Sequence, residues 1–115
     1  MLVVEDDPEL RTLYRTALAL AGYSVTGAED GVEALRRIDA DPPDLIVLDI
    51  GLPRLGGRDV QREIASHAET ASIPILVVTG DTSGLSAGDF ACILRKPVDL
   101  DDLVAAVERC LHGSR

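Results

Sequence analysis

The chain contains no tryptophan, one phenylalanine and only two tyrosines among its 115 residues. Hydrophobic residues still make up 46% of the sequence, which is enough to fill a buried core. We therefore expect that core to be aliphatic, built from Leu, Val, Ile and Ala. The length fits one domain of ordinary size, so we expect residues 1–115 to form a single domain.

Long apolar runs and basic residues are also scarce. No apolar stretch approaches the roughly 18 residues of a membrane-spanning helix. The first residues, Met1 to Asp6, lack the basic region and the cleavage site of a secretory signal. Eleven basic residues against 20 acidic ones give a net charge of −9, whereas nucleic acids and anionic membranes are bound by clustered Lys and Arg. We therefore expect a cytoplasmic protein without a direct nucleic-acid or membrane partner.

The chain has only two cysteines, Cys92 and Cys110, and both lie in apolar stretches. Their spacing does not match a zinc site. Buried thiols are more common than a disulfide in a cytosolic protein, so we expect two buried, free cysteines.

Five short apolar stretches are typical of strands, and they alternate with segments of helical periodicity. The predicted strands are residues 2–5, 23–27, 45–49, 75–79 and 90–95. The predicted helices begin at Asp7-Pro8, at Asp30, near Gly57 and at Asp99. Strict alternation of this kind predicts parallel βαβ units with right-handed crossovers.

The helical segments carry end signals and apolar stripes. In the first helix the stripe is Leu10, Leu13, Tyr14, Ala17, Leu18 and Ala21, and Gly22 ends it. In the second helix Asp30 and Glu33 form a capping pair, and the predicted inner face is Val32, Leu35 and Ile38. Between residues 80 and 89, Gly80, Gly84 and Gly88 disfavour a long helix, so we expect a loop or a single turn. Residues 112–115 are predicted to be a frayed end.

Polar side chains follow the carboxyl ends of four predicted strands: Glu5, Asp6, Asp49, Thr79 and Lys96. Ligands of open α/β sheets bind at this edge. Clustered carboxylates stay ionised together when a cation is close, and oxygen ligands suit Mg²⁺. A carboxylate can also accept a phosphoryl group. The sequence therefore predicts a magnesium-dependent phosphoryl-accepting site.

Each of these residues also has a plainer interpretation. Asp7 and its acidic neighbours are typical of helix capping, Thr79 of a strand residue, and Lys96 of a surface charge. Their joint placement at one sheet edge favours a site. A phosphatase with an Asp-x-Asp pair is excluded because Gly51 stands where the second acid would be. Dinucleotide binding is excluded because no Gly-x-Gly-x-x-Gly follows the first strand.

The chain resembles a response-regulator receiver domain of two-component signalling over essentially its whole length. The matching segments, in order, are residues 2–7, 43–49, 52–53 with Gly57, 75–80 and 96–97. The resemblance implies a doubly wound (βα)5 flavodoxin-like sandwich with a five-stranded parallel sheet in the order 2-1-3-4-5. It also implies a signalling domain rather than an enzyme, one that assists its own phosphorylation and dephosphorylation.

The resemblance assigns a role to each site residue. Asp49 is the implied phosphoacceptor. Glu5, Asp6, Asp49 and the backbone carbonyl of Gly51 are the implied Mg²⁺ ligands. Thr79 and Lys96 are implied to contact the phosphoryl group, and the Lys96–Pro97 bond to be cis. The implied partner is a histidine kinase or a histidine phosphotransfer protein.

Two departures from the family pattern affect the expected output. Ile93 occupies the switch position that usually carries an aromatic residue. The segment from Thr79 to Lys96 is shorter by about one helical turn, which predicts a shortened fourth helix. Both features resemble receivers attached to hybrid histidine kinases, and the short helix favours a monomer over the common dimer. They also keep open the alternative of a phosphorylation-independent interaction module, against which the complete set of site residues argues.

Overall fold

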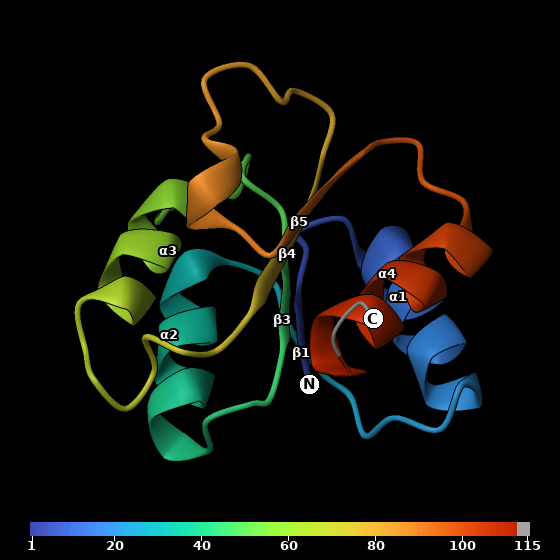
Figure 1. Cartoon of the computed structure of the whole chain (residues 1–115), viewed down its shortest axis with the longest axis horizontal. Helices are drawn as coiled ribbons and strands as arrows, with labels where there is room; N and C mark the ends of the chain where they lie inside the picture. The colour runs from blue at the N-terminus through green and yellow to red at the C-terminus, as the bar shows by residue number, and fades with distance from the viewer. Residues whose placement is uncertain (113–115) are drawn as a thin grey trace.

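Five parallel strands form the central sheet of the computed structural model, which describes residues 1–112 (Figure 1). The strands are β1 (Leu2–Val4), β2 (Thr26–Ala28), β3 (Ile46–Leu48), β4 (Ile75–Thr79) and β5 (Cys92–Arg95). Their order in the sheet is β2-β1-β3-β4-β5, and all neighbours are parallel. The predicted fold class and strand order are therefore confirmed.

Four helices cover the two faces of this sheet. The helices α1 (Pro8–Leu20) and α4 (Leu100–His112) lie on one face, and α2 (Gly31–Ala40) and α3 (Gly57–Ala65) lie on the other (Figure 1). Successive strand residues point to opposite faces, so Val3 packs with the α1–α4 core while Val4 packs with the α2–α3 core. Because both faces are covered, the inner strands are almost wholly apolar.

The predicted helix ends are confirmed by hydrogen bonds. The carboxylate of Asp7 accepts a bond from the Glu9 backbone N–H at 2.9 Å, and Pro8 is the first residue of α1. The carboxylate of Asp30 accepts a bond from the Glu33 N–H at 2.8 Å. Gly22, with φ of 102°, follows the end of α1 in the conformation that glycine adopts most easily.

The second strand begins at Thr26, so its predicted start at residue 23 was wrong. The backbone N–H of Tyr23 instead donates to the carbonyl of Leu18 at 3.1 Å, which closes the end of α1. Ala21, at the end of the predicted stripe, is exposed, and so are two large apolar residues predicted to point inward, Leu13 at 49% and Val32 at 38%. Leu13 and Val32 each lie one position, about 100° around the helix, from the buried residues Tyr14 and Gly31.

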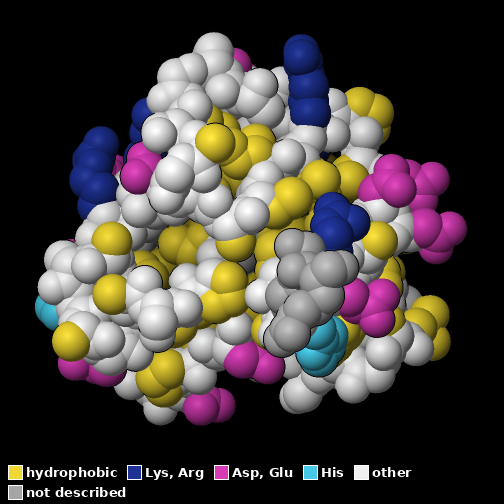
Figure 2. All heavy atoms as spheres, viewed as in Figure 1, with side chains coloured by type: hydrophobic (Ala, Val, Ile, Leu, Met, Phe, Trp, Pro, Cys, Tyr) yellow, Lys and Arg dark blue, Asp and Glu magenta, His cyan; other side chains and the backbone are white. Residues whose placement is uncertain are grey.

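The chain between β4 and β5 forms only one short helical turn, η1 (Ala87–Asp89), which confirms the predicted shortening of the fourth helix. Gly84 in this segment has φ of 75°, a conformation that is unfavourable for other residues. β5 is an edge strand, in which Cys92, Ile93 and Leu94 are partly buried and Arg95 is exposed. In the view of Figure 1, β4 and β5 lie at the centre of the molecule, and Figure 2 shows apolar side chains at the surface in the same place.

Three smaller expectations concern the cysteines, the C-terminal end and membrane-spanning helices. Cys92 and Cys110 are free but only half-buried, since Cys92 lies on the edge strand β5. His112 belongs to α4 rather than to a frayed end, and residues 113–115 lie outside the described residues. Within residues 1–112, no helix combines the length and the apolar character needed to cross a membrane.

Candidate functional site

The carboxyl ends of β1 and β3 bring three carboxylates together. Glu5 and Asp6 follow β1, Asp49 follows β3, and the last residues of these neighbouring strands, Val4 and Leu48, are paired. Glu5, Asp6 and Asp49 each offer an oxygen within 4.8 Å of the others. The acidic cluster predicted from the strand ends is therefore formed.

Two of these carboxylates are buried and are oriented by backbone N–H groups. Glu5 is 2% exposed and Asp49 is 8% exposed, whereas Asp6 faces solvent. The Asp7 N–H donates to Oε2 of Glu5 at 3.1 Å, and the Gly51 N–H donates to Oδ1 of Asp49 at 3.1 Å. One oxygen of each buried carboxylate is thus fixed by the loop that follows its strand.

Lys96, immediately after β5, supplies the positive charge between the two buried carboxylates. Its Nζ donates to Oε1 of Glu5 at 2.8 Å and to Oδ2 of Asp49 at 3.1 Å. The Lys96 side chain is 23% exposed, so these ion pairs are largely shielded from water. One ammonium group thus pairs with two carboxylates, and Asp6 adds a third carboxylate to the same cluster, so Lys96 alone does not neutralise the cluster.

The pKa shifts follow from this arrangement. Burial raises the pKa of Glu5 above its usual value, although the hydrogen bonds from Lys96 and Asp7 oppose this effect. Burial lowers the pKa of Lys96, but the hydrogen bonds to Glu5 and Asp49 and the charges of these two carboxylates together outweigh burial, and the pKa is raised. Lys96 consequently stays protonated at neutral pH.

Thr79 and Lys96 end neighbouring strands at the same edge. Thr79 is 4% exposed, and its carbonyl accepts a hydrogen bond from the Lys96 N–H at 2.9 Å. The Lys96–Pro97 peptide bond is cis, as the resemblance implied. Ile93 pairs with Val77 in the sheet and packs, partly buried, against the α2–α3 core.

Sequence reasoning did not find two contacts that support the cluster. Nη1 of Arg11, in α1, donates to the carbonyl of Glu5 at 2.8 Å. Gly57, the first residue of α3, lies so close to the Asp49 loop that a Cβ there would be 2.5 Å from the Asp49 carbonyl oxygen. The glycine was visible in the sequence, but both contacts depend on where the helices pack beside β1 and β3.

The donor set fits Mg²⁺. All three candidate side-chain ligands are carboxylates, the hard oxygen ligands that this ion prefers. Asp6 is exposed, so the cluster opens to solvent, and Mg²⁺ usually keeps several waters. The buried negative charge that Lys96 does not neutralise would be compensated by such a cation.

The fold is a flavodoxin-like α/β sandwich with strand order 2-1-3-4-5. Its carboxyl edge carries an acidic cluster with a lysine between two of the carboxylates, and the donor set of this cluster fits a divalent cation. Residues 1–108 match the family model described as the response regulator receiver domain, and the chain belongs to this family. It is thus a signalling domain of two-component systems rather than an enzyme in the ordinary sense. The match is to receivers in general, so the finer resemblance to hybrid-kinase receivers stays a prediction.

Curated relatives and solved structures agree with this assignment. The response regulator MprA of Mycobacterium avium (strain 104) is 42% identical over 123 residues, covering 100% of this chain and 52% of that protein. The chain thus spans about half the length of the curated relatives it matches. The receiver domain of NtrX from Brucella abortus is 28% identical with a TM-score of 0.88, covering 98% of each chain. The chemotaxis protein CheY4 of Vibrio cholerae is 28% identical with a TM-score of 0.88, covering 96% of each chain.

Proposed function

We propose that residues 1–115 form one receiver domain that takes a phosphoryl group from a phosphohistidine onto Asp49 and then changes its surface for a partner. The observation that carries the proposal is the position of Lys96, whose Nζ joins Asp49 to Glu5 beside the exposed Asp6. Receiver domains imply a histidine kinase partner. The immediate donor would be such a kinase or a histidine phosphotransfer protein, in the cytoplasm.

The chemistry of the proposed transfer uses the groups at this edge. An Asp49 carboxylate oxygen attacks the phosphorus of the phosphohistidine, the phosphorus–nitrogen bond breaks, and its electron pair stays on the imidazole nitrogen. The Lys96 ammonium stabilises charge on the phosphoryl oxygens, and the Thr79 hydroxyl donates to another of them. Glu5, Asp6, Asp49 and the Gly51 carbonyl would hold Mg²⁺, which when bound neutralises phosphoryl charge.

The proposed switch follows from the loss of an ion pair. Once Asp49 carries a phosphoryl group, its Oδ2 no longer pairs with Lys96 as it does at 3.1 Å in this structure. Lys96 then moves toward the phosphoryl oxygens, and Thr79 follows because its carbonyl is bonded to the Lys96 N–H. The ends of β4 and β5 therefore shift between two packings of the same fold. Because Ile93 stands in place of an aromatic residue, the structural change reaches the surface without rotation of an aromatic ring at this position.

Mass spectrometry of the intact protein tests this function directly. Incubation with Mg²⁺ and phosphoramidate, a small phosphodonor, should add one phosphoryl group to the wild-type protein and none to Asp49→Asn. A thermal melt of Asp49→Asn is the control for folding, and it should show a cooperative transition. The absence of an adduct on wild type, or an equal adduct on Asp49→Asn, would contradict the proposal.

The alternative is a receiver-shaped interaction module that works without phosphorylation. Ile93 and the single turn η1 favour it, because both alter the usual route from site to surface. The complete cluster of Glu5, Asp6, Asp49 and Lys96 favours the phosphoacceptor. The short segment between β4 and β5 also leads us to propose a monomer. The mass experiment separates the two functions, since the module would take up no phosphoryl group.

A further inference from the structure

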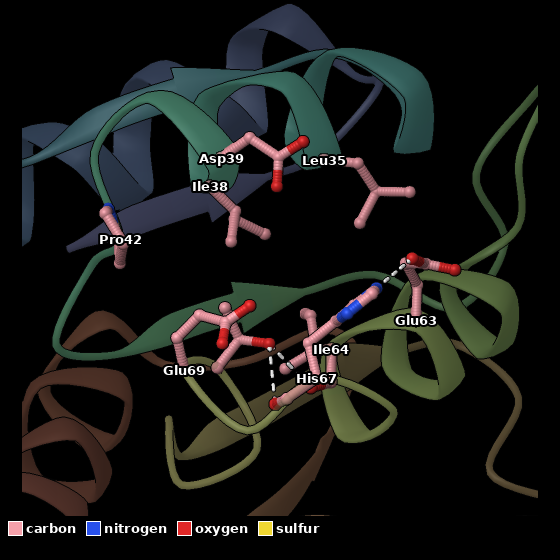
Figure 3. Close-up of a pocket in the computed structure, with 9 residues that line it drawn as sticks. Leu35, Ile38, Asp39, Pro42, Glu63, Ile64, His67 and Glu69 are labelled. Carbon is pink, nitrogen blue, oxygen red and sulfur yellow. Dashed lines mark hydrogen bonds and ion pairs between the residues drawn. The ribbon is translucent and has the colours of Figure 1, made fainter.

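A groove separate from the acidic site lies between the C-terminal ends of α2 and α3 (Figure 3). Its volume is about 350 Å³, and it is lined by Leu35, Ile38, Asp39, Pro42, Glu63, Ile64, His67, Glu69 and Thr70. In parallel βαβ units the helices run opposite to the strands, so helix C-termini lie at the edge of the sheet away from Glu5 and Asp49. We call this surface the α2–α3 groove.

The α2–α3 groove has an apolar floor. Ile38 and Ile64 are each 2% exposed at its base, and Leu35 beside them is half-buried. Figure 3 shows Leu35 and Ile38 pointing from α2 across the groove toward the segment that carries Ile64. Thr70 is buried, and its hydroxyl donates to the Ile64 carbonyl at 2.7 Å, so its polar group is already satisfied. The floor therefore suits an apolar side chain.

The rim of the α2–α3 groove is negatively charged. It carries three exposed carboxylates, Asp39, Glu63 and Glu69, and among its nine lining residues, all within the described part of the chain, there is no Lys or Arg. His67 lies with Nε2 2.6 Å from Oε2 of Glu63, so a protonated His67 offsets only one of the three charges. The C-termini of α2 and α3 add further partial negative charge.

We propose that the α2–α3 groove docks a segment of another protein that presents an apolar side chain flanked by Arg or Lys. The apolar side chain would lie on Ile38 and Ile64, and the basic side chains would pair with Asp39, Glu63 and Glu69. An amphipathic helix laid into a hydrophobic groove presents side chains in this pattern. A second copy of this chain is a poor occupant because each copy carries a net charge of −9.

The groove lies at the opposite edge from Asp49, so the docked partner would be distinct from the phosphodonor. The test uses the unphosphorylated full chain without Mg²⁺, which makes its outcome independent of the chemistry at Asp49. The probe is a synthetic helical peptide with leucines on one face and flanking arginines. Titration into ¹⁵N-labelled protein should shift the amide signals of residues 35–42 and 63–70.

Variants that remove carboxylates test whether the rim of the α2–α3 groove contributes to peptide affinity. Affinity is measured by fluorescence with the same peptide carrying a dye. The triple variant Asp39→Asn, Glu63→Gln, Glu69→Gln should bind this peptide roughly tenfold more weakly, because three favourable ion pairs are lost. The matched control Asp101→Asn, Asp102→Asn, Glu108→Gln removes the same charge from exposed positions of α4 and should change affinity less than about twofold, since distant charges are screened. A peptide with serine in place of each leucine, but the same charge, should bind more weakly than the original.

Three outcomes would overturn the proposal. They are equal weakening by both triple variants, amide shifts centred outside the α2–α3 groove, and undiminished binding of the serine peptide. If the groove triple variant does not fold, the exposed single change Glu69→Lys replaces it, with Glu108→Lys as its control. Glu69→Lys should then weaken the arginine peptide, and equal affinities of these two single variants would refute the proposed site.

Discussion

Lys96 is the only lysine in the chain, and its ammonium group lies between two buried carboxylates. Replacing a charged partner at such a position leaves the remaining charges without compensation. In this protein those charges, Glu5 and Asp49, belong to the proposed site itself. The residue proposed to contact the phosphoryl group therefore also stabilises the unphosphorylated fold.

The first prediction concerns this double role. Lys96→Met should lower the free energy of unfolding by about 3 kcal/mol, because Glu5 and Asp49 are left facing each other in a buried site. Urea unfolding at pH 7.5 without Mg²⁺ measures the loss. Arg95→Met, at the exposed neighbouring position, is the matched control and should change stability by less than about 0.5 kcal/mol. Equal stabilities of the two variants would show that the ion pairs do not contribute.

The second prediction concerns the protonation of His67. The hydrogen bond to Glu63 and the charge of that carboxylate raise the pKa of His67 above its usual value. Because the folded pKa is raised, the pair stabilises the fold fully below the unfolded pKa of about 6.5, and this contribution is lost as pH rises through the folded value. An NMR titration of the imidazole should give a pKa above about 6.5, and Glu63→Gln should lower it. An unchanged pKa in Glu63→Gln would contradict the assigned cause.

At the scale of elements, the start of α3 determines the position of the Asp49 loop. Gly57 packs against that loop with no room for a side chain, since a Cβ would lie 2.5 Å from the Asp49 carbonyl oxygen and 2.7 Å from the Ile50 Cα. The neighbouring Gly56 differs, because the nearest atom to a Cβ there would be 3.7 Å away and its φ is −69°. These two adjacent glycines form a natural pair for a test.

The third prediction is that Gly57→Ala destabilises the protein by about 2 kcal/mol through overpacking, while Gly56→Ala is close to neutral. Displacement of the loop should also slow phosphoryl uptake at Asp49 in the Gly57→Ala variant. Urea unfolding and the rate of the mass change with phosphoramidate measure both effects. Similar behaviour of the two variants would show that the close approach at Gly57 is not needed.

Some elements could be predicted from the sequence because their signals are local. Asp7-Pro8 and Gly22 delimit α1 through contacts within a few residues of each helix end. The exposure of Leu13 and Val32 could not be predicted in this way. Both are apolar and helical, but tertiary packing covers their neighbours instead: Tyr14 lies in the α1–α4 core, and Gly31 lies against Leu55.

At the scale of the whole molecule, the net negative charge of the chain and the negative charge of the acidic cluster both mean that added cations should stabilise the fold. The chain carries a charge of −9, and part of it is concentrated at Glu5, Asp6 and Asp49. Salt of any kind screens general self-repulsion, whereas a cation that binds the folded state stabilises it by mass action. The two effects can be separated by comparing ions at equal ionic strength.

The fourth prediction is that MgCl₂ raises the melting temperature more than NaCl does at equal ionic strength. Mg²⁺ at 100 times its Kd would contribute about 2.7 kcal/mol. Asp6→Asn should lose most of the Mg²⁺-specific part and keep the NaCl effect, whereas Asp102→Asn, which removes the same charge from α4, should keep both. Equal effects of MgCl₂ and NaCl on the wild-type protein would argue against the proposed metal site.

The sequence by itself determined the alternation of strands and helices and the residues that stand at each strand end. Apolar runs, caps and glycine breaks act over a few residues, and parallel strands present their carboxyl ends at one edge. Only the tertiary structure decided that Lys96 contacts both Glu5 and Asp49, that Arg11 supports Glu5, and that α2 and α3 enclose an acidic groove. These contacts depend on how separate segments pack together, which no local pattern specifies.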